Sequence, residues 1–174
     1  MTLNKSQSSF REYLRKPEFR DNYASQSGVH RELGVRICDV MDDGVSMAFT
    51  PTADLYSSDK SMSCDMGPVA TVMDSAMGLS VMLSLEEFSS IATLELRIDW
   101  IEDPSPDAEI LIETKVDAVK EDLVFVSAQA KHEDCALPFC RGTARFMLTS
   151  GKGSLSNIVI AAAKAQEFPD ERGE

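Results

Sequence analysis

The longest apolar run of the chain, Met66–Leu85, contains a single charged residue, Asp74. Its 20 residues are enough to cross a bilayer as a helix. A carboxylate near the middle of such a helix costs about 2.5–3.5 kcal/mol on membrane insertion, and the interspersed glycine, proline and serine residues make the run less apolar still. The run therefore predicts a helix that is buried inside a soluble protein.

Short β-patterns lie on both sides of this predicted helix. Before it, Val35–Met41 and Val45–Pro51 are joined by Asp42-Asp43-Gly44, a good hairpin signal. After it, four runs alternate between apolar and polar residues, as in strands with one covered face. These runs span residues 91–101, 108–119, 123–132 and 139–149. In the first of them, the residues predicted to share the apolar face are Ala92, Leu94, Leu96, Ile98 and Trp100.

The predicted order is thus two strands, one long buried helix and four strands. A helix that is apolar nearly all round has to be enclosed, and a curved antiparallel sheet is the one element here that can enclose it. The sequence predicts an α+β hotdog fold over residues 29–150, in which the sheet wraps around the central helix. Residues 1–28 are predicted as an N-terminal helical extension, helical over 8–25 with a break at Pro17, and residues 151–174 as a C-terminal tail. Ala53–Asp65 is predicted as a long polar loop.

The net negative charge argues against partners that are themselves negatively charged. Acidic residues outnumber basic ones by 29 to 17, which gives a net charge of −12 at pH 7. Such a surface repels phosphate backbones and anionic lipid, so we expect neither nucleic acid nor a membrane as a partner. The start of the chain, Met1–Leu14, is polar and has no apolar signal region, and we expect a cytoplasmic protein.

The cysteines and histidines do not suggest a metal site. The four cysteines are widely spaced and none forms a CxxC pair, and His30 and His132 do not supply the close ligand pairs that zinc requires. We expect four buried, reduced thiols and two histidines at the surface or at a strand end. The cysteines are Cys38, Cys64, Cys135 and Cys140.

Asp74 is the first candidate for chemistry, because it is the one charge on a helix predicted to be buried. Burying an unpaired carboxylate is costly or raises its pKa, and active sites use that perturbation for acid–base work. The alternative is a structural aspartate that is hydrogen-bonded to Ser75 or to a neighbouring backbone N–H.

The start of the helix is the second candidate. Gly67 permits close backbone approach, and the free N–H groups of a first turn suit a carbonyl oxygen that acquires negative charge. The alternative is a plain helix cap made by Ser63 or Asp65. Gly67 and Asp74 are seven residues apart, about 10 Å along a helix. If both act on one carbonyl, they must come from two chains with antiparallel central helices, so the catalytic interpretation predicts a dimer.

Residues 30–148 resemble the hotdog acyl-CoA thioesterases of the phenylacetic-acid-degradation type. The segments that carry the resemblance are His30-Arg31-Glu32-Leu33-Gly34, Met66 to Gly78, Thr93-Leu94-Glu95-Leu96 and Arg141-Gly142-Thr143-Ala144-Arg145-Phe146. Asp65 and Met66 stand where the family has a histidine and a glycine, and Tyr56 with its neighbouring serines stands where the family has an asparagine.

The resemblance implies a role for particular residues. Asp74 matches the general base or nucleophile, and the backbone N–H of Met66, with Gly67 beside it, matches the oxyanion donor. The residues that would contact the substrate are Asp65, Tyr56, Ser75, Gly78 and Thr93. It implies no cofactor beyond coenzyme A as part of the substrate, and a homodimer or a dimer of dimers (a homotetramer).

Two functions remain open at this point. One is an acyl-CoA thioesterase that hydrolyses a small or medium acyl-CoA thioester at a dimer interface. The other is a non-catalytic hotdog module that binds an acyl thioester or acts as a regulator, which the altered Asp65-Met66-Gly67 segment favours. Three arginines either meet the phosphates of coenzyme A or form ion pairs with Glu95, Glu113 or Asp117. These arginines are Arg97, Arg141 and Arg145.

Overall fold

The computed structural model describes residues 12–13, 15–23, 28–52, 65–85, 89–105, 108–132 and 134–149. The helices and strands, in chain order, are α2 (Pro17–Asn22), α3 (Gly28–Glu32), β1 (Arg36–Val40), β2 (Val45–Phe49), α4 (Met66–Ser84), β3 (Ser90–Trp100), β4 (Ile110–Lys120), β5 (Leu123–His132) and β6 (Cys140–Thr149).

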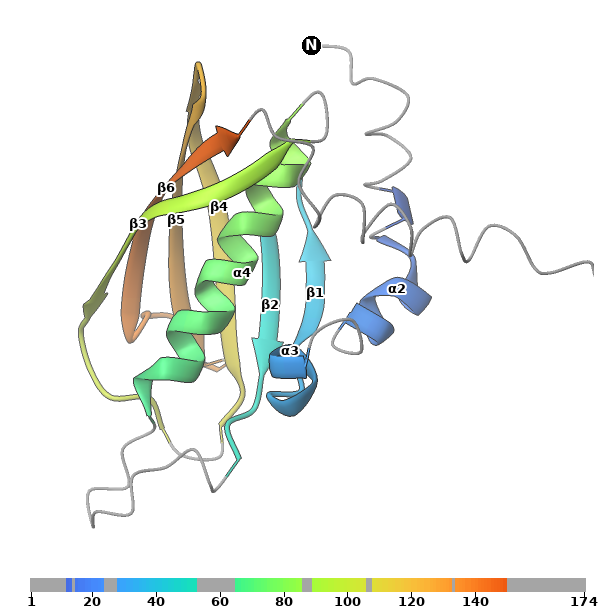
Figure 1. Ribbon diagram of the computed structural model, residues 1–174. Coiled ribbons are helices and arrows are strands. Elements are labelled where there is room, and N and C mark those ends of the chain that lie inside the picture. Colours follow the sequence, from blue (N-terminus) through green and yellow to red (C-terminus); the bar gives the residue numbers. More distant parts are fainter. Residues whose placement is uncertain are drawn as a thin grey trace, which may run out of the picture.

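Six strands form one antiparallel sheet in the order β1-β2-β4-β5-β6-β3. The sheet curves around α4, which lies along its concave face (Figure 1). The predicted α+β architecture of a curved antiparallel sheet around one central helix is therefore confirmed. Its physical basis is the alternation along the strands, because every second side chain is buried in the first half of β4 and along most of β5 and β6.

Helix α4 begins at Met66, as predicted, and ends one residue before the predicted end. All side chains from Ala76 to Val81 are buried. Among the described residues α4 is the one helix long and apolar enough to span a membrane, and half of that apolar stretch is buried inside the protein. The helix approaches β6 closely, because a Cβ at Gly142 would overlap the side chain of Met73. Glycine is therefore the residue that lets sheet and helix meet here.

Strand β3 departs from the predicted alternation. Thr93 pairs with Phe146 and Glu95 pairs with Arg145, which leaves Leu94 in a β-bulge between them. The bulge reverses the faces of the strand, so that Thr93 lies on the side of the buried Phe146 and Leu94 is 53% exposed. The prediction that Ala92 and Leu94 share the inner face with the later apolar residues is therefore wrong.

The predicted hairpin turn is confirmed, and a second tight turn lies at Gly34. The β1–β2 hairpin turns through residues 42–44, and a Cβ at Gly44 would overlap the carbonyl oxygen of Thr114. Gly34 has a positive φ of 63°, a backbone conformation that favours glycine, and it precedes β1.

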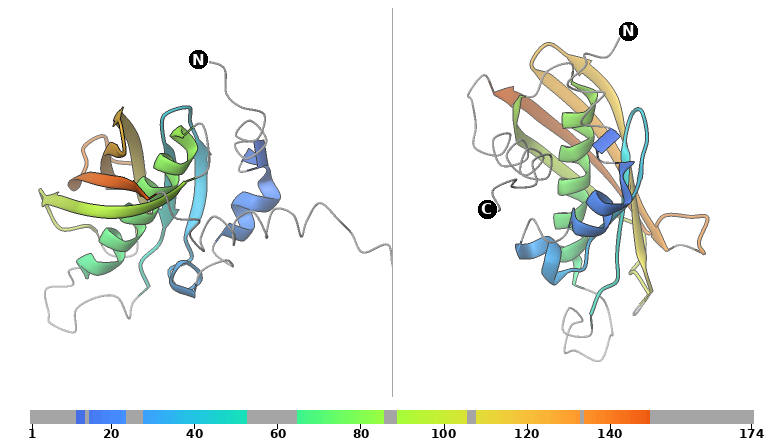
Figure 2. Two further views of the ribbon diagram at one scale, coloured as in Figure 1. Left: turned by 45° about the horizontal axis from the view of Figure 1, so that its top comes forward. Right: turned by 90° about the vertical axis from the view of Figure 1, so that its right-hand side faces the viewer.

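The N-terminal part of the chain matches the prediction at Pro17 but contains one helix more than predicted. Helix α2 begins at Pro17, and α3 is a short helix that the sequence pattern did not predict. Figure 2 shows α2 beside β1, the strand at one edge of the sheet. Two arginines bond this segment to β1: Arg15, just before α2, donates to the carbonyl oxygen of Val40, and Arg20 Nε of α2 donates to that of Ile37. Residues 53–64, which include Tyr56, and the tail 151–174 lie outside the described residues.

The cysteines correct one expectation. Cys140 is buried, and burial raises the pKa of its thiol to about 11. Cys38 is half-buried and Cys135 is exposed, so the expectation of four buried thiols is wrong for these two. Cys135 and Cys140 are free thiols, and Cys64 lies outside the described residues.

Candidate functional site

Asp74 lies on the side of α4 that faces β3. Thr93 Oγ1 donates a hydrogen bond to Asp74 Oδ1 at 3.1 Å, and the aspartate is half-buried in the single chain. The bulge at Leu94 makes this contact possible, because it turns Thr93 towards the helix. Neither partner named in the structural alternative is found here: Asp74 is held by Thr93 rather than by Ser75 or a neighbouring backbone N–H.

The beginning of α4 is open to solvent. Gly67 is exposed, and no atom of the described residues lies within 4 Å of where a Cβ would stand. Asp65 is exposed in the N-cap position with extended backbone, but its side chain makes no capping hydrogen bond. Capping by Asp65 is therefore not what shapes this helix start, and Ser63 lies outside the described residues. Because Gly67 is exposed, the N–H groups of the first turn are candidates for binding a ligand.

The two candidate features share one face of α4. Residues seven apart on an α-helix project in nearly the same direction, so Gly67 and Asp74 lie along one strip, about 10 Å apart. Thr71 lies between them, is exposed, and donates from Oγ1 to the carbonyl oxygen of Gly67 at 2.9 Å. The exposed strip ends at Gly78, where side-chain atoms of Ile91 and Phe146 lie 3.6 and 3.8 Å from the position that a Cβ on Gly78 would take. Gly78 is thus the buried inner end of an open polar strip.

Ser75 projects about 100° around the helix from Asp74, towards His30 of α3. Its Oγ donates to the carbonyl oxygen of Thr71 at 2.9 Å and lies 2.8 Å from His30 Nε2. His30 is therefore not a surface residue: its ring is half-buried, stacks on Tyr23 with centroids 5.2 Å apart, and has a pKa lowered by burial. Sequence reasoning did not place His30 at the site, although it opens the segment His30–Gly34 that carries the resemblance.

His132, in contrast, is at a strand end as predicted. It is the last residue of β5, and its Nε2 accepts a hydrogen bond from the backbone N–H of Ser105 at 2.8 Å. Its Nδ1 lies 3.1 Å from the carbonyl oxygen of Glu109.

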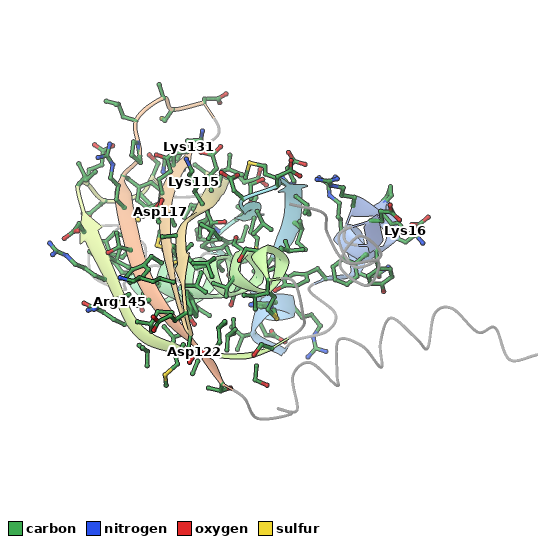
Figure 3. All side chains as sticks on the ribbon, turned by 90° about the horizontal axis from the view of Figure 1, so that it is seen from above. Lys16, Lys115, Asp117, Asp122, Lys131 and Arg145 are labelled. Atoms are coloured by element: carbon green, nitrogen blue, oxygen red, sulfur yellow. The ribbon has the colours of Figure 1, made fainter. Side chains whose placement is uncertain are left out.

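The arginines of β3 and β6 lie on the solvent side of the sheet. Figure 3 shows Arg145 on the outside of the curved sheet, which wraps around α4. Arg145 pairs with Glu95, as the ion-pair alternative predicted, whereas Arg97 pairs with Asp99 at 2.8 Å. These guanidinium groups are therefore not beside Asp74. Within the part of the chain that the structure describes, no three His, Cys, Asp or Glu side chains lie together in a way that could hold a metal ion.

Comparison with solved structures identifies the architecture. A Shewanella oneidensis protein related to the thioesterase superfamily superposes with a TM-score of 0.67 at 16% identity, covering 84% of this chain and 99% of that one. The zebra fish thioesterase superfamily member 2 gives a TM-score of 0.61 at 17% identity, over 86% and 99% of the two chains. The chain has the hotdog fold. The Escherichia coli PaaI protein of the phenylacetic acid degradation operon shares this hotdog fold too, with a TM-score of 0.63 at 12% identity over 84% and 94% of the chains.

Comparison of sequences alone adds nothing to this result, because no family model and no curated protein matches the chain. The hotdog fold is shared, while the residues of the site have to be argued from their own geometry.

Proposed function

We propose that the protein is an acyl-CoA thioesterase that acts on a small or medium acyl chain at a dimer interface, in the cytoplasm. The observation that carries this proposal is the contact between Asp74 and Thr93 on an open strip of α4 that also contains an accessible helix start. A carboxylate oriented by a hydroxyl is suited to general-base or nucleophilic work, and backbone N–H groups are suited to an oxyanion.

In the proposed reaction Asp74 takes a proton from water, which attacks the thioester carbonyl. The carbonyl oxygen becomes an oxyanion that the N–H groups at Met66 and Gly67 of a second chain stabilise. The carbon–sulfur bond then breaks, the thiolate leaves and takes up the proton, and a carboxylic acid and a thiol are the products. Direct attack by the Asp74 carboxylate is the variant of the same chemistry with an acyl-enzyme intermediate.

Two structural observations support the dimer. Asp74 and the helix start lie about 10 Å apart on one chain, which is too far for one carbonyl. Strand β3 is 11 residues long and lies at the edge of the sheet, with no further strand beyond it among the described residues. An edge strand offers unpaired backbone groups to a second copy.

The test of this proposal is a panel of acyl-CoA thioesters of increasing chain length, with the released thiol detected by a dye. We expect turnover of at least one short or medium acyl-CoA by the purified full-length protein. Absence of turnover across the panel would refute the proposal.

One observation favours the second candidate, an acyl-thioester-binding module without catalysis. Asp65 places an exposed carboxylate directly before the N–H groups that an oxyanion would use. The charge opposes a developing negative charge in that position. The two candidates are separated by Asp65→His, which we expect to raise kcat/KM on the same acyl-CoA panel if the chain is a thioesterase. If Asp65→His keeps its fold, binds a non-hydrolysable acyl-CoA thioether and still shows no turnover, the binding module is the correct function.

A further inference from the structure

His30 joins the N-terminal part of the chain to the central helix at the turn that carries Asp74. The imidazole comes from α3, and its Nε2 lies 2.8 Å from Ser75 Oγ on α4, 45 residues along the chain. The same helical turn is also held by β3, through the Thr93–Asp74 hydrogen bond. Consecutive residues of an α-helix project about 100° apart, so the turn at 74–75 is bonded in two different directions, to α3 and to β3.

The protons of this contact can be assigned. Ser75 has one hydroxyl proton, and it is used in the hydrogen bond to the carbonyl oxygen of Thr71 at 2.9 Å. His30 Nε2 must then be the donor in the contact with Ser75 Oγ. Burial lowers the pKa of His30, which favours the neutral ring, so the imidazole is the Nε2–H tautomer.

The ring of His30 is also fixed from its other side. Tyr23 stacks on it with an interplanar angle of 24°, and Phe19 packs edge-on against Tyr23 with centroids 6.1 Å apart. Burial raises the pKa of Tyr23 to about 12, so this phenol stays neutral. Aromatic packing of this kind restricts the imidazole to one orientation, in which its N–H points at Ser75.

We propose that His30 is a positioning residue for Asp74, acting through Ser75. The proposal rests on the proposed thioesterase function. The physical reason is geometric: a carboxylate about 6 Å from a helix axis moves about 1 Å when the helix turns by about 10°. A misplacement of 1 Å at a reacting group can cost up to about 10²-fold in rate. Ser75 acts in this assignment as the link between His30 and α4 rather than as a donor to substrate. Its hydroxyl proton is used in the bond to Thr71, and one lone pair accepts from His30.

The experiment is a double-mutant cycle on hydrolysis by the full-length protein, with His30→Ala, Ser75→Ala and the double variant. We expect each single variant to lower kcat by about tenfold with little change in KM, and the double variant to be no slower than the slower single one, because both remove the same contact. His30→Gln keeps an N–H near the position of Nε2, so we expect it to restore kcat to within about threefold of wild type. His132→Gln is the matched control, since that ring bonds backbone groups of Ser105 and Glu109 and should leave kcat unchanged.

Three results would each overturn the proposal. They are additive losses of kcat in the double variant, an unchanged kcat in His30→Ala, and a kcat of His30→Gln as low as that of His30→Ala. A second measurement, amide hydrogen exchange over residues 71–78, does not depend on turnover. We expect exchange about tenfold faster in His30→Ala and wild-type exchange in His30→Gln. If the wild-type protein hydrolyses no thioester, the proposed function fails, and the exchange data alone decide whether His30 holds α4 in place. In that case unchanged exchange in His30→Ala would also refute the positioning role of His30.

Discussion

At the scale of single residues, the site depends on contacts that join distant parts of the chain. Asp74 could be selected from the sequence because it is the one charge in a long apolar run. Its partner Thr93 is a candidate site residue only through the resemblance, since the alternation pattern places Thr93 on the solvent face of the strand. His30 was assigned to the surface because no local pattern reveals a contact with a residue 45 positions away.

The first prediction concerns Asp74→Asn. Asparagine keeps the size of the side chain and can accept the Thr93 hydrogen bond, but it is neither a base nor a nucleophile. We expect the hydrolysis rate to fall by roughly 10²–10⁴-fold while the melting temperature stays close to that of wild type. The measurement is kcat/KM beside a thermal melt.

The matched control for that variant is Asp117→Asn. Asp117 also accepts a hydroxyl hydrogen bond, from Ser127 at 2.9 Å, but it lies on the outer side of the sheet (Figure 3). Its amide variant should retain wild-type turnover. Near wild-type activity in Asp74→Asn would remove Asp74 from the mechanism.

A second prediction follows from the lowered pKa of His30. The unfolded chain has the ordinary pKa of 6.5, above that of the folded protein, so between the two values the unfolded state binds more protons. The free energy of unfolding should therefore fall as the pH falls through this window below 6.5. We expect wild type to lose more stability than His30→Gln between pH 7.5 and 5.5 in urea titrations. Equal losses in both proteins would contradict the assignment of a neutral, buried His30.

At the scale of elements, the sequence predicted the helix and all six strands well, because their hydrophobic periods are long and clear. It did not predict the β-bulge at Leu94, since a bulge requires one extra residue and no particular residue type at that position. One inserted residue moves every following side chain to the other face. The irregular residue of β3 is therefore the reason that a hydroxyl faces Asp74.

The third prediction concerns the contact between α4 and β6. In Gly142→Ala the new methyl group would overlap Met73 and meet Met77, whose flexible side chains must then shift. We expect a loss of about 1–3 kcal/mol in the free energy of unfolding. Urea titration is the measurement, and Gly28→Ala is the control, because no atom of the part of the chain that the structure describes lies within 4 Å of a Cβ there. Equal stability of the two variants would show that sheet and helix are not tightly packed at this point.

At the scale of the whole molecule, the proposed reaction requires two chains. The strip on α4 places the carboxylate and the helix start too far apart for one carbonyl, and the sheet ends at β3 with exposed residues such as Leu94. The spacing of Gly67 and Asp74 in the sequence gives the same expectation of a dimer, which stays a prediction. The boundaries of the extension and the tail, at 28/29 and 150/151, stay predictions.

The fourth prediction is that the full-length protein is a dimer or a larger even-numbered assembly in solution. Light scattering coupled to size-exclusion chromatography measures the mass directly, against 19.1 kDa for one chain. A stable and active monomer would contradict a site built from two chains.

The arginines that reach β1 have a consequence for how copies of this chain can add to one another. A sheet with two open edges can grow without limit, because each added copy presents a new edge. Here Arg15 and Arg20 occupy carbonyl groups of β1, the strand at the edge opposite β3. When two copies pair through the β3 edge of each, neither copy has a β3 edge left for a third copy, and the assembly stops growing. The N-terminal arginines thus favour a finite particle over a filament.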